Sequence, residues 1–276
     1  MKPPLGRDTR LCMSLSGRPG NFGTRFQNSL YEQLGLDFVY KAFTTTDLEG
    51  AVRGIRALGI RGCAVSMPFK EAVIPLLDRL EGSAAAIDSV NTIVNDDGML
   101  TGFNTDYQAV RTLLARNGIG AGTRFLLRGS GGMAKAVAAA LRDEGATQGT
   151  IVARNRTTGE AIAGAYGFGW SAEPTASGAA LLINVTPLGM EGADADTLAF
   201  SPDAISAAQT VFDVVALPAE TPLVRAGRAA GKRVVTGAEV IVLQAVEQFR
   251  LYTGVDPSAV QIRIAAVAAG VEMASA

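Results

Sequence analysis

A glycine-rich segment between a strand-like and a helix-like run constrains the fold more than any other part of this chain. Residues 123–129 (TRFLLRG) have the apolar composition of a buried strand, and residues 132–145 (GMAKAVAAALRDEG) have the pattern of a helix. Residues 150–155 (TIVARN) follow as a second strand. A strand, a helix and a second strand in this order predict a parallel βαβ unit.

The same alternation extends over the rest of the chain. We predict further strands at 10–16, 38–44, 62–67, 89–95, 99–103, 180–186, 210–216 and 233–237. Asp97-Gly98, between 89–95 and 99–103, predicts a hairpin turn. Helices are predicted at 24–34 with a stop at Gly35, from a cap at 46 or 47 to 58, and from Pro68 to Leu80 with a kink or split at Pro75. Further helices are predicted over 107–118, through about Tyr166, and at 238–252 and 257–272. The predicted fold class is therefore α/β.

The length of 276 residues is comfortable for two domains. We place one domain at 1–106, with the C-terminal helices of about 240–276 returning to it. We expect this domain to be a mostly parallel α/β unit. Residues 107–239 are predicted to form a Rossmann-type nucleotide-binding domain.

Composition narrows the classes of partner. The formal charge of −1 gives no overall field for nucleic acid or anionic membranes. The apolar runs are all shorter than the ~20 residues that a membrane span needs. The first ten residues (MKPPLGRDTR) lack an apolar signal core, so we expect a cytoplasmic protein. A small-molecule substrate and a monomer or homodimer are the expectation.

The chain contains no histidine. This excludes Ser–His and Cys–His nucleophilic systems and any zinc site with a histidine ligand, and no metal is predicted. Proton transfer must therefore use Lys, Asp, Glu, Tyr, Cys or water. Cys12 and Cys63 both lie in apolar strand-like runs, and we expect buried, reduced thiols.

The glycine-rich segment has the features of a dinucleotide-binding loop. Gly129 permits a tight turn, Gly131 lets the backbone approach a pyrophosphate, and Gly132 leaves the helix N-terminus bare for an anion. Ala134 occupies the third small position. An ordinary glycine-rich turn is the competing interpretation, but it would not need three glycines in four positions.

The end of the next predicted strand indicates which dinucleotide binds. An NAD-binding site usually has Asp or Glu there, whereas this chain has Ala153-Arg154-Asn155-Arg156-Thr157. Two cations and no carboxylate suit a 2′-phosphate, so we predict NADP as the cofactor. Arg156 could stack on the adenine or clamp the phosphate. Solvated arginines at a strand end are the alternative.

Lys70 and Asp106 are the candidate catalytic pair. Each is predicted just after a strand-like run, at the start of a helix, and ligands bind at that edge of open α/β sheets. A cation in the first turn faces the positive end of the helix macrodipole, whereas a carboxylate there is stabilised. Taken separately, the two would be a surface lysine and a helix cap. Together with a nucleotide loop, they form a plausible proton-handling pair.

Several motifs resemble the shikimate dehydrogenase family. In family order over nearly the whole chain they are SLS (14–16), GCAVSMPFKE (62–71), SVNT (89–92), GFNTD (102–106), GSGGMAKA (129–136), NRT (155–157), NVTPLGM (184–190) and the segment 237–254. The pattern is most similar to the shikimate dehydrogenase-like subfamily. The resemblance implies an N-terminal substrate domain, a C-terminal NADP domain with a cleft between them, and NADP-linked interconversion of 3-dehydroshikimate and shikimate in aromatic amino acid biosynthesis.

The resemblance also implies roles for individual residues. Lys70 and Asp106 match the catalytic positions. The implied substrate-binding residues are Ser14, Ser16, Ser66, Asn91 and Gln244. The implied cofactor-binding residues are Gly129, Ser130, Gly131, Gly132, Met133, Ala134, Asn155, Arg156, Thr157, Val214 and Gly237. Gln248 lies one turn after Gln244, so the two amides share a helix face.

The chain departs from the family pattern at several positions. Ala64 replaces the usual Asn, Ser66 the usual Thr, Ala216 the usual Tyr, and Glu160 a frequent second Arg. These changes predict weak shikimate oxidation and a related polyhydroxy cyclohexene or cyclohexane carboxylate as substrate. The alternatives are a quinate or aminoshikimate dehydrogenase, and an NADP-binding regulatory protein with vestigial catalysis.

Overall fold

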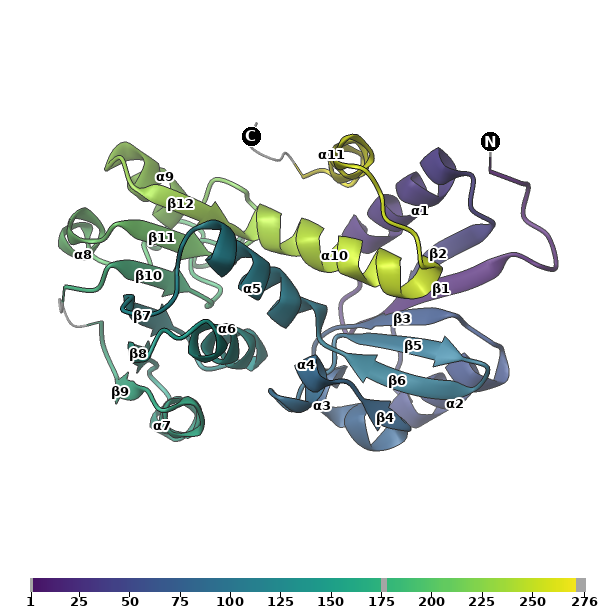
Figure 1. The fold of residues 1–276 in the computed structure, drawn as a ribbon, viewed down its shortest axis with the longest axis horizontal. Coiled ribbons are helices and arrows are strands. Elements are labelled where there is room, and N and C mark those ends of the chain that lie inside the picture. Colours follow the sequence, from purple (N-terminus) through teal and green to yellow (C-terminus); the bar gives the residue numbers. More distant parts are fainter. Residues whose placement is uncertain (1, 175–177, 272–276) are drawn as a thin grey trace. The chain divides into compact units, whose positions relative to one another are not determined.

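The computed structural model describes residues 2–174 and 178–271, and these residues form two compact units (Figure 1). One unit comprises the chain up to Thr105 and the chain from Val242 onward, and the other is Asp106–Ile241. Each unit contains one six-stranded sheet. The α/β class predicted from the sequence is confirmed. The binding roles predicted for the two domains stay predictions.

The first unit has a mixed sheet. Its strands are β1 (Arg10–Leu15), β2 (Phe38–Phe43), β3 (Gly62–Val65), β4 (Arg79–Leu80), β5 (Thr92–Asp96) and β6 (Met99–Phe103), in the order β2-β1-β3-β5-β6-β4. Strand β1 is parallel to β2 and β3, whereas β5 is antiparallel to both β3 and β6. The helices that carry residues of this unit are α1 (Phe22–Leu34), α2 (Leu48–Ala57), α3 (Phe69–Ala72), η1 (Ile74–Leu76), α4 (Gly82–Ala85), α10 (Gly237–Thr253) and α11 (Ala259–Ala268).

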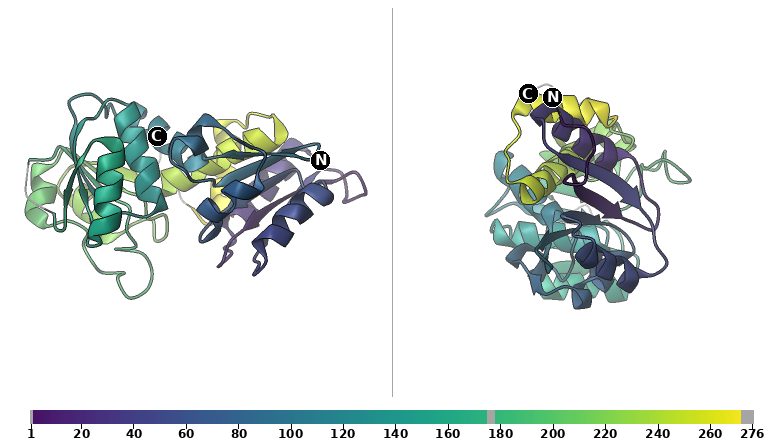
Figure 2. Two further views of the ribbon diagram at one scale, coloured as in Figure 1. Left: turned by 90° about the horizontal axis from the view of Figure 1, so that it is seen from below. Right: turned by 90° about the vertical axis from the view of Figure 1, so that its right-hand side faces the viewer.

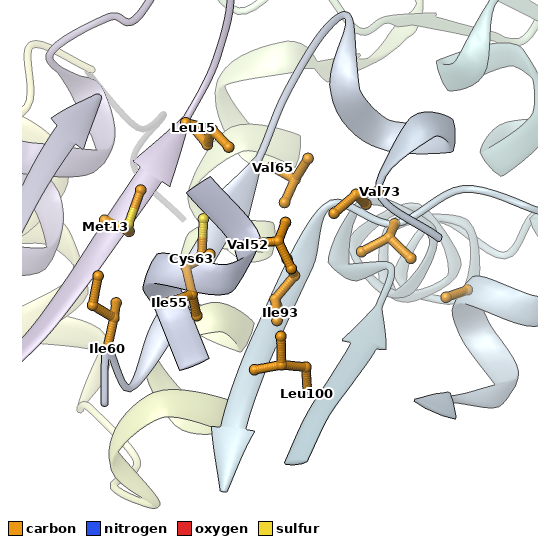
Figure 3. Close-up of a cluster of buried hydrophobic side chains, with 12 residues drawn as sticks. Met13, Leu15, Val52, Ile55, Ile60, Cys63, Val65, Val73, Ile93 and Leu100 are labelled. Carbon is orange, nitrogen blue, oxygen red and sulfur yellow. The ribbon is translucent and has the colours of Figure 1, made fainter. Parts of the chain in front are cut away.

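Apolar side chains fill the space between this sheet and α2. Val52 and Ile55 of α2 pack on side chains from the four strands β1, β3, β5 and β6 (Figure 3). The pairing of Met13 with Cys63 places both side chains on this face. Cys12 precedes Met13 in the strand and therefore points to the opposite face. Both cysteines are free and buried, as predicted.

The second unit is built on a fully parallel sheet. Its strands are β7 (Arg124–Arg128), β8 (Gln148–Val152), β9 (Gly169–Ser171), β10 (Leu181–Asn184), β11 (Thr210–Asp213) and β12 (Arg233–Thr236), in the order β12-β11-β10-β7-β8-β9. Its helices are α5 (Thr105–Arg116), α6 (Gly132–Asp143), α7 (Arg156–Tyr166), α8 (Pro202–Ala207) and α9 (Pro222–Ala229), several of which are visible in Figure 2. The strand order reverses between β7 and β10, which is the topological switch point of a doubly wound sheet.

Local signals explain where several elements begin and end. Asp47 caps α2 by accepting a hydrogen bond from the N–H of Gly50 at 2.7 Å. The hairpin between β5 and β6 turns at Asp97 and Gly98, with φ values of +50° and +91°. Two consecutive positive φ angles are the geometry that Asp-Gly favours in a tight hairpin, and this prediction is confirmed.

The predicted interruption of the helix at Pro75 is confirmed, whereas its predicted extension to Leu80 is wrong. Helix α3 begins one residue after Pro68 and ends at Ala72, the short turn η1 follows, and Leu80 belongs to strand β4. Pro75 has no N–H, and its ring would clash with the carbonyl group four residues earlier, so the helix cannot continue through it. The strand predicted at 150–155 is also displaced: β8 is Gln148–Val152, and Asn155 caps α7.

None of the helices within residues 2–174 and 178–271 has the length and apolar character needed to cross a bilayer. Over the same residues, no group of three or more acidic or cysteine side chains is arranged to hold a metal ion.

Candidate functional site

Serines of the first unit meet at the carboxyl ends of β1 and β3. Ser14 is in β1, and Ser16 follows that strand. The N–H of Ser66 donates to the carbonyl oxygen of Leu15 at 2.9 Å, which holds the chain after β3 beside the end of β1. The hydroxyl of Ser16 lies 3.5 Å from the carbonyl oxygen of Met67. The three predicted substrate serines are therefore brought to one edge of the sheet.

Lys70 is the second residue of α3, directly beyond this edge. Its backbone carbonyl accepts a hydrogen bond from the N–H of Val90 at 2.8 Å, which joins the lysine turn to the segment before β5. Helix α3 has only four residues, so its macrodipole is small. The helix end that was predicted to face Lys70 therefore carries only a weak dipole.

Asn91 connects the lysine turn to the start of α5. Its side chain is 3% exposed, and Oδ1 accepts hydrogen bonds from the Thr105 N–H at 2.7 Å and the Thr92 hydroxyl at 2.8 Å. Among the residues that the structure describes, no partner is found for the Nδ2 group of Asn91. This amide is therefore the part of Asn91 that can donate to a ligand. Asp106 follows Thr105 in the chain, so Asn91 fixes the backbone just before the candidate carboxylate.

Two glutamines of α10 extend the same network. Gln248 is buried, and its Nε2 donates to the Thr92 hydroxyl at 3.1 Å. The Thr105 hydroxyl donates to Oε1 of Gln244 at 3.4 Å. Sequence reasoning placed Gln244 and Gln248 on one face but missed Thr92 and Thr105. Both threonines follow an asparagine in the motifs SVNT and GFNTD, and this repeated pair was the available signal.

Ala64 lies in the middle of this polar edge. Its register partners are Ser14 on β1 and Thr92 on β5, so the three side chains form a row on one face of the sheet. A methyl group at the centre of that row donates and accepts no hydrogen bond. A substrate that contacts the row therefore meets hydroxyl groups on either side of an apolar position.

The second unit presents the glycine-rich loop between β7 and α6. Gly129 has φ +128°, and a Cβ there would lie 2.6 Å from Cγ2 of Val185. A Cβ at Gly131 or Gly132 would meet nothing within 4 Å. The start of the 12-residue helix α6 is thus open toward solvent at Gly131 and Gly132, while the N–H groups of Ala134 and Lys135 donate to the carbonyl oxygen of Gly131.

The remaining predicted loop residues have different surroundings. The hydroxyl of Ser130 lies 2.7 Å from that of Thr158, which joins the loop to the first turn of α7. Met133 is half-buried and Ala134 is fully buried. Ala134 therefore supplies close packing beneath the loop, while Gly131 and Gly132 supply the open surface.

Cationic side chains surround the start of α7. Asn155 caps the helix by accepting from the Thr158 N–H at 3.2 Å, and Thr157 is exposed. The guanidinium of Arg156 lies 5.5 Å from the centroid of the Trp170 ring. Arg154 is also exposed. An open loop at a helix N-terminus, followed by two exposed arginines, fits the pyrophosphate and 2′-phosphate of NADP.

The other predicted cofactor residues lie at the ends of β11 and β12. The Val214 N–H donates to the carbonyl oxygen of Asn184 at 3.0 Å. A Cβ at Gly237 would overlap the backbone of Val215, so glycine is required for this close approach. The buried carboxylate of Asp213, which sequence reasoning missed, accepts from the Thr221 hydroxyl at 2.6 Å and from Nδ2 of Asn184 at 3.0 Å. Burial raises the pKa of Asp213, although these hydrogen bonds oppose the shift.

Comparisons with known proteins find a matching family model and a relative similar over most of the chain. A family model described as the shikimate dehydrogenase substrate binding domain matches residues 22–93. A shikimate dehydrogenase-like protein of Haemophilus influenzae is 53% identical over 255 residues, which are 92% of this chain and 94% of that protein.

Two solved structures have the same fold. The shikimate 5-dehydrogenase of Thermus thermophilus, in complex with NADP(H) and shikimate, matches with a TM-score of 0.84 and 30% identity over 94% of this chain and 99% of that one. A 5-ketofructose reductase of a Gluconobacter strain matches with a TM-score of 0.83 and 26% identity over 96% and 99%. The length and identity of the match to the Haemophilus relative show that this chain belongs to the shikimate dehydrogenase family.

Proposed function

We propose that the protein is an NADP-dependent dehydrogenase that interconverts an alcohol and a ketone on a shikimate-like polyhydroxy carboxylate. The observation that carries this proposal is the hydrogen bond from the Val90 N–H to the Lys70 carbonyl. That bond places Lys70 next to the Asn91 network, which in turn fixes the chain before Asp106. Within the family, the bound structure with NADP(H) and shikimate supports the choice of cofactor and substrate class.

In the proposed reaction, the protein transfers the proton and the cofactor transfers the hydride. NADP, when bound, supplies the nicotinamide that accepts or returns the hydride. Lys70 takes the hydroxyl proton of the alcohol through Nζ and gives it back in the reverse direction. Asp106 orients the lysine and accepts a hydrogen bond from a neighbouring substrate hydroxyl.

Polar side chains of the first unit recognise the substrate. Ser14, Ser16 and Ser66 offer hydroxyls at the sheet edge, and Asn91 offers its Nδ2 group. Gln244 contributes an amide from α10. A site of this kind discriminates against analogues that lack a hydroxyl, because the polar groups that a bound analogue covers would then be unpaired.

The nucleotide is held by the second unit. Gly131 and Gly132 let the pyrophosphate approach the N-terminus of α6, and Arg156 binds the 2′-phosphate. The other contributing residues are Gly129, Ser130, Met133, Ala134, Asn155, Thr157, Val214 and Gly237.

Shikimate itself is proposed to be a poor substrate. Ala64 provides no hydrogen bond between Ser14 and Thr92, and Ala216 provides no phenol. Each missing hydrogen bond costs about 1 kcal/mol of binding or transition-state stabilisation. The physiological substrate is therefore a related compound that lacks a polar group at the position facing Ala64.

Replacing Lys70 by methionine tests the catalytic assignment. We expect Lys70→Met to lower kcat by roughly 10²–10⁴-fold, because it removes the proton-transferring group. The affinity for NADP⁺ should be unchanged. Lys41→Met is the matched control, because Lys41 is an exposed lysine on β2 of the same unit. Undiminished turnover by Lys70→Met would contradict the mechanism.

A substrate panel tests the class of reaction. Shikimate, quinate and an amino analogue of shikimate would be assayed with NADP⁺ and NAD⁺, and 5-ketofructose with the reduced cofactors. We expect one compound other than shikimate to have the highest kcat/KM. Binding of NADP⁺ without turnover of any of these compounds would contradict the proposed reaction on them and favour the alternative of a regulatory NADP-binding protein.

A further inference from the structure

We infer that Glu160 weakens binding of the 2′-phosphate and thereby lowers the preference of this protein for NADP over NAD. The inference deepens the proposed function, because it rests on the assignment of Arg156 to the 2′-phosphate. It concerns the carboxylate that lies closest along α7 to that arginine.

Glu160 occupies one edge of the Arg156 guanidinium. The Nε group of Arg156 donates to Oε1 of Glu160 at 3.0 Å, and the two residues are one turn apart on α7. Both side chains are exposed, at 74% for Arg156 and 48% for Glu160. The carboxylate therefore stands in solvent beside the group that is proposed to bind a phosphate.

The ring of Trp170 holds the same guanidinium independently of Glu160. Arg156 lies over this ring, and Trp170 is itself fixed by a hydrogen bond from Nε1 to the carbonyl oxygen of Ala153 at 3.2 Å. Gly159 allows the ring to lie against α7, because a Cβ there would overlap the indole. Arg156 thus keeps a supporting surface when Glu160 is neutralised.

Glu160 has two opposing effects on the affinity for NADP. Glu160 helps to order Arg156, but an exposed pair one turn apart on a helix contributes little. It also repels a phosphate that carries nearly two negative charges, and this repulsion acts over several ångströms at low salt. Repulsion is therefore the larger effect on NADP. Glu160 favours binding of NAD, because a carboxylate can accept a hydrogen bond from the ribose 2′-hydroxyl.

Trp170 makes the inference directly measurable. It is the single tryptophan of the chain, so intrinsic fluorescence reports on the surroundings of Arg156. Titration of NADP⁺ and NAD⁺ into the wild-type protein and Glu160→Gln, followed by Trp170 emission and by calorimetry, gives both dissociation constants without an activity assay.

We expect Glu160→Gln to tighten NADP⁺ binding by about three- to tenfold in 50 mM salt, and by less in 0.5 M salt. NAD⁺ binding should stay the same or weaken. Glu49→Gln is the matched control, since Glu49 also pairs with an exposed arginine one turn later, Arg53 of α2. This control should change neither constant.

A companion variant separates failure of the inference from failure of the proposed function. Arg156→Gln should weaken NADP⁺ binding, as the proposed function requires. Suppose that Arg156→Gln weakens NADP⁺ binding as expected. If Glu160→Gln then leaves the ratio of the NADP⁺ and NAD⁺ dissociation constants unchanged, or weakens NADP⁺ binding, only the inference about Glu160 is overturned. If Arg156→Gln has no effect on NADP⁺, the assignment of Arg156 and the inference both fail.

Discussion

At the scale of single residues, two positions of the loop before α6 are glycine for different reasons. Gly129 has φ +128°, a region that side chains rarely adopt, and a Cβ there would press on Val185. Gly131 has φ −90°, which any residue adopts, and a Cβ would stand in open space. Gly129 is therefore needed for the fold, whereas Gly131 matters only if something approaches the loop.

Alanine substitution should separate these two requirements. We expect Gly129→Ala to lower the free energy of unfolding by about 2 kcal/mol or more, from backbone strain and the contact with Val185. Gly131→Ala should stay within about 0.5 kcal/mol of the wild type and weaken NADP⁺ binding about tenfold. Urea denaturation and Trp170 titration measure the two effects. Equal NADP⁺ affinity in Gly131→Ala would argue against the pyrophosphate lying on this loop.

The sequence predicted the location of Asn91 but not its hydrogen bonds. The motif SVNT marked Asn91 as polar and worth noting, and the structure places it at the predicted edge of the sheet. The way its Oδ1 is shared between Thr92 and Thr105 depends on the register of β5 and β6 and on the start of α5. Such a pairing is set by tertiary structure, so spacing along the chain could not predict it.

At the scale of elements, local signals predicted most of the strands and helices. The cap Asp47, the stop Gly35 and the turn Asp97-Gly98 each act within a few residues, and each is confirmed. Helices α8 and α9 were missed although they carry a local signal. Each begins with a capping hydroxyl followed by proline, Ser201-Pro202 and Thr221-Pro222.

Strand β4 could not have been predicted in the same way. It is only two residues long, and its pairing depends on hydrogen bonds to a distant part of the chain. The N–H of Glu81, directly after β4, donates to the carbonyl oxygen of Gly102 at 2.9 Å. Leu80 fits a helical pattern in the sequence, and the non-local pairing with β6 overrides it.

Asp213 joins three elements of the second unit and should give an unusual pH dependence. It ends β11, bonds to Asn184 of β10, and accepts from Thr221, which caps α9. Burial raises the pKa of Asp213 in the folded state above the unfolded value of about 3.9. The protonated group therefore contributes stability that is present below pH 4 and is lost as the pH rises through the folded-state pKa.

Asp213→Asn removes this titration. We expect the wild type to gain stability relative to the variant as the pH is lowered from 7 toward 4, with about 1.4 kcal/mol for each tenfold difference in the acid dissociation constant. Urea midpoints at several pH values measure the gain. Asp196→Asn, at an exposed position of the same unit, should show no such trend. A wild type that loses stability relative to Asp213→Asn on acidification would contradict the assignment.

At the scale of the whole molecule, the two units carry separate natural probes. Trp170 is in the second unit, and Cys12 and Cys63 are both buried in the first. Burial raises the pKa of the Cys12 thiol to about 12, so neither access nor ionisation favours its alkylation in the folded protein. Tryptophan emission therefore follows unfolding of one unit, and thiol labelling follows unfolding of the other.

These probes test whether a nucleotide bound to one unit stabilises both. At 100 times its dissociation constant, NADP⁺ contributes about 2.7 kcal/mol to the state that binds it, which raises a midpoint by about 5–10 °C. We expect both probes to shift together, because α10 is continuous across the boundary between Ile241 and Val242. Disrupting a helix on one side of such a boundary removes hydrogen bonds that the other side shares. A shift in Trp170 emission with unchanged labelling of Cys12 and Cys63 would show instead that the units unfold independently.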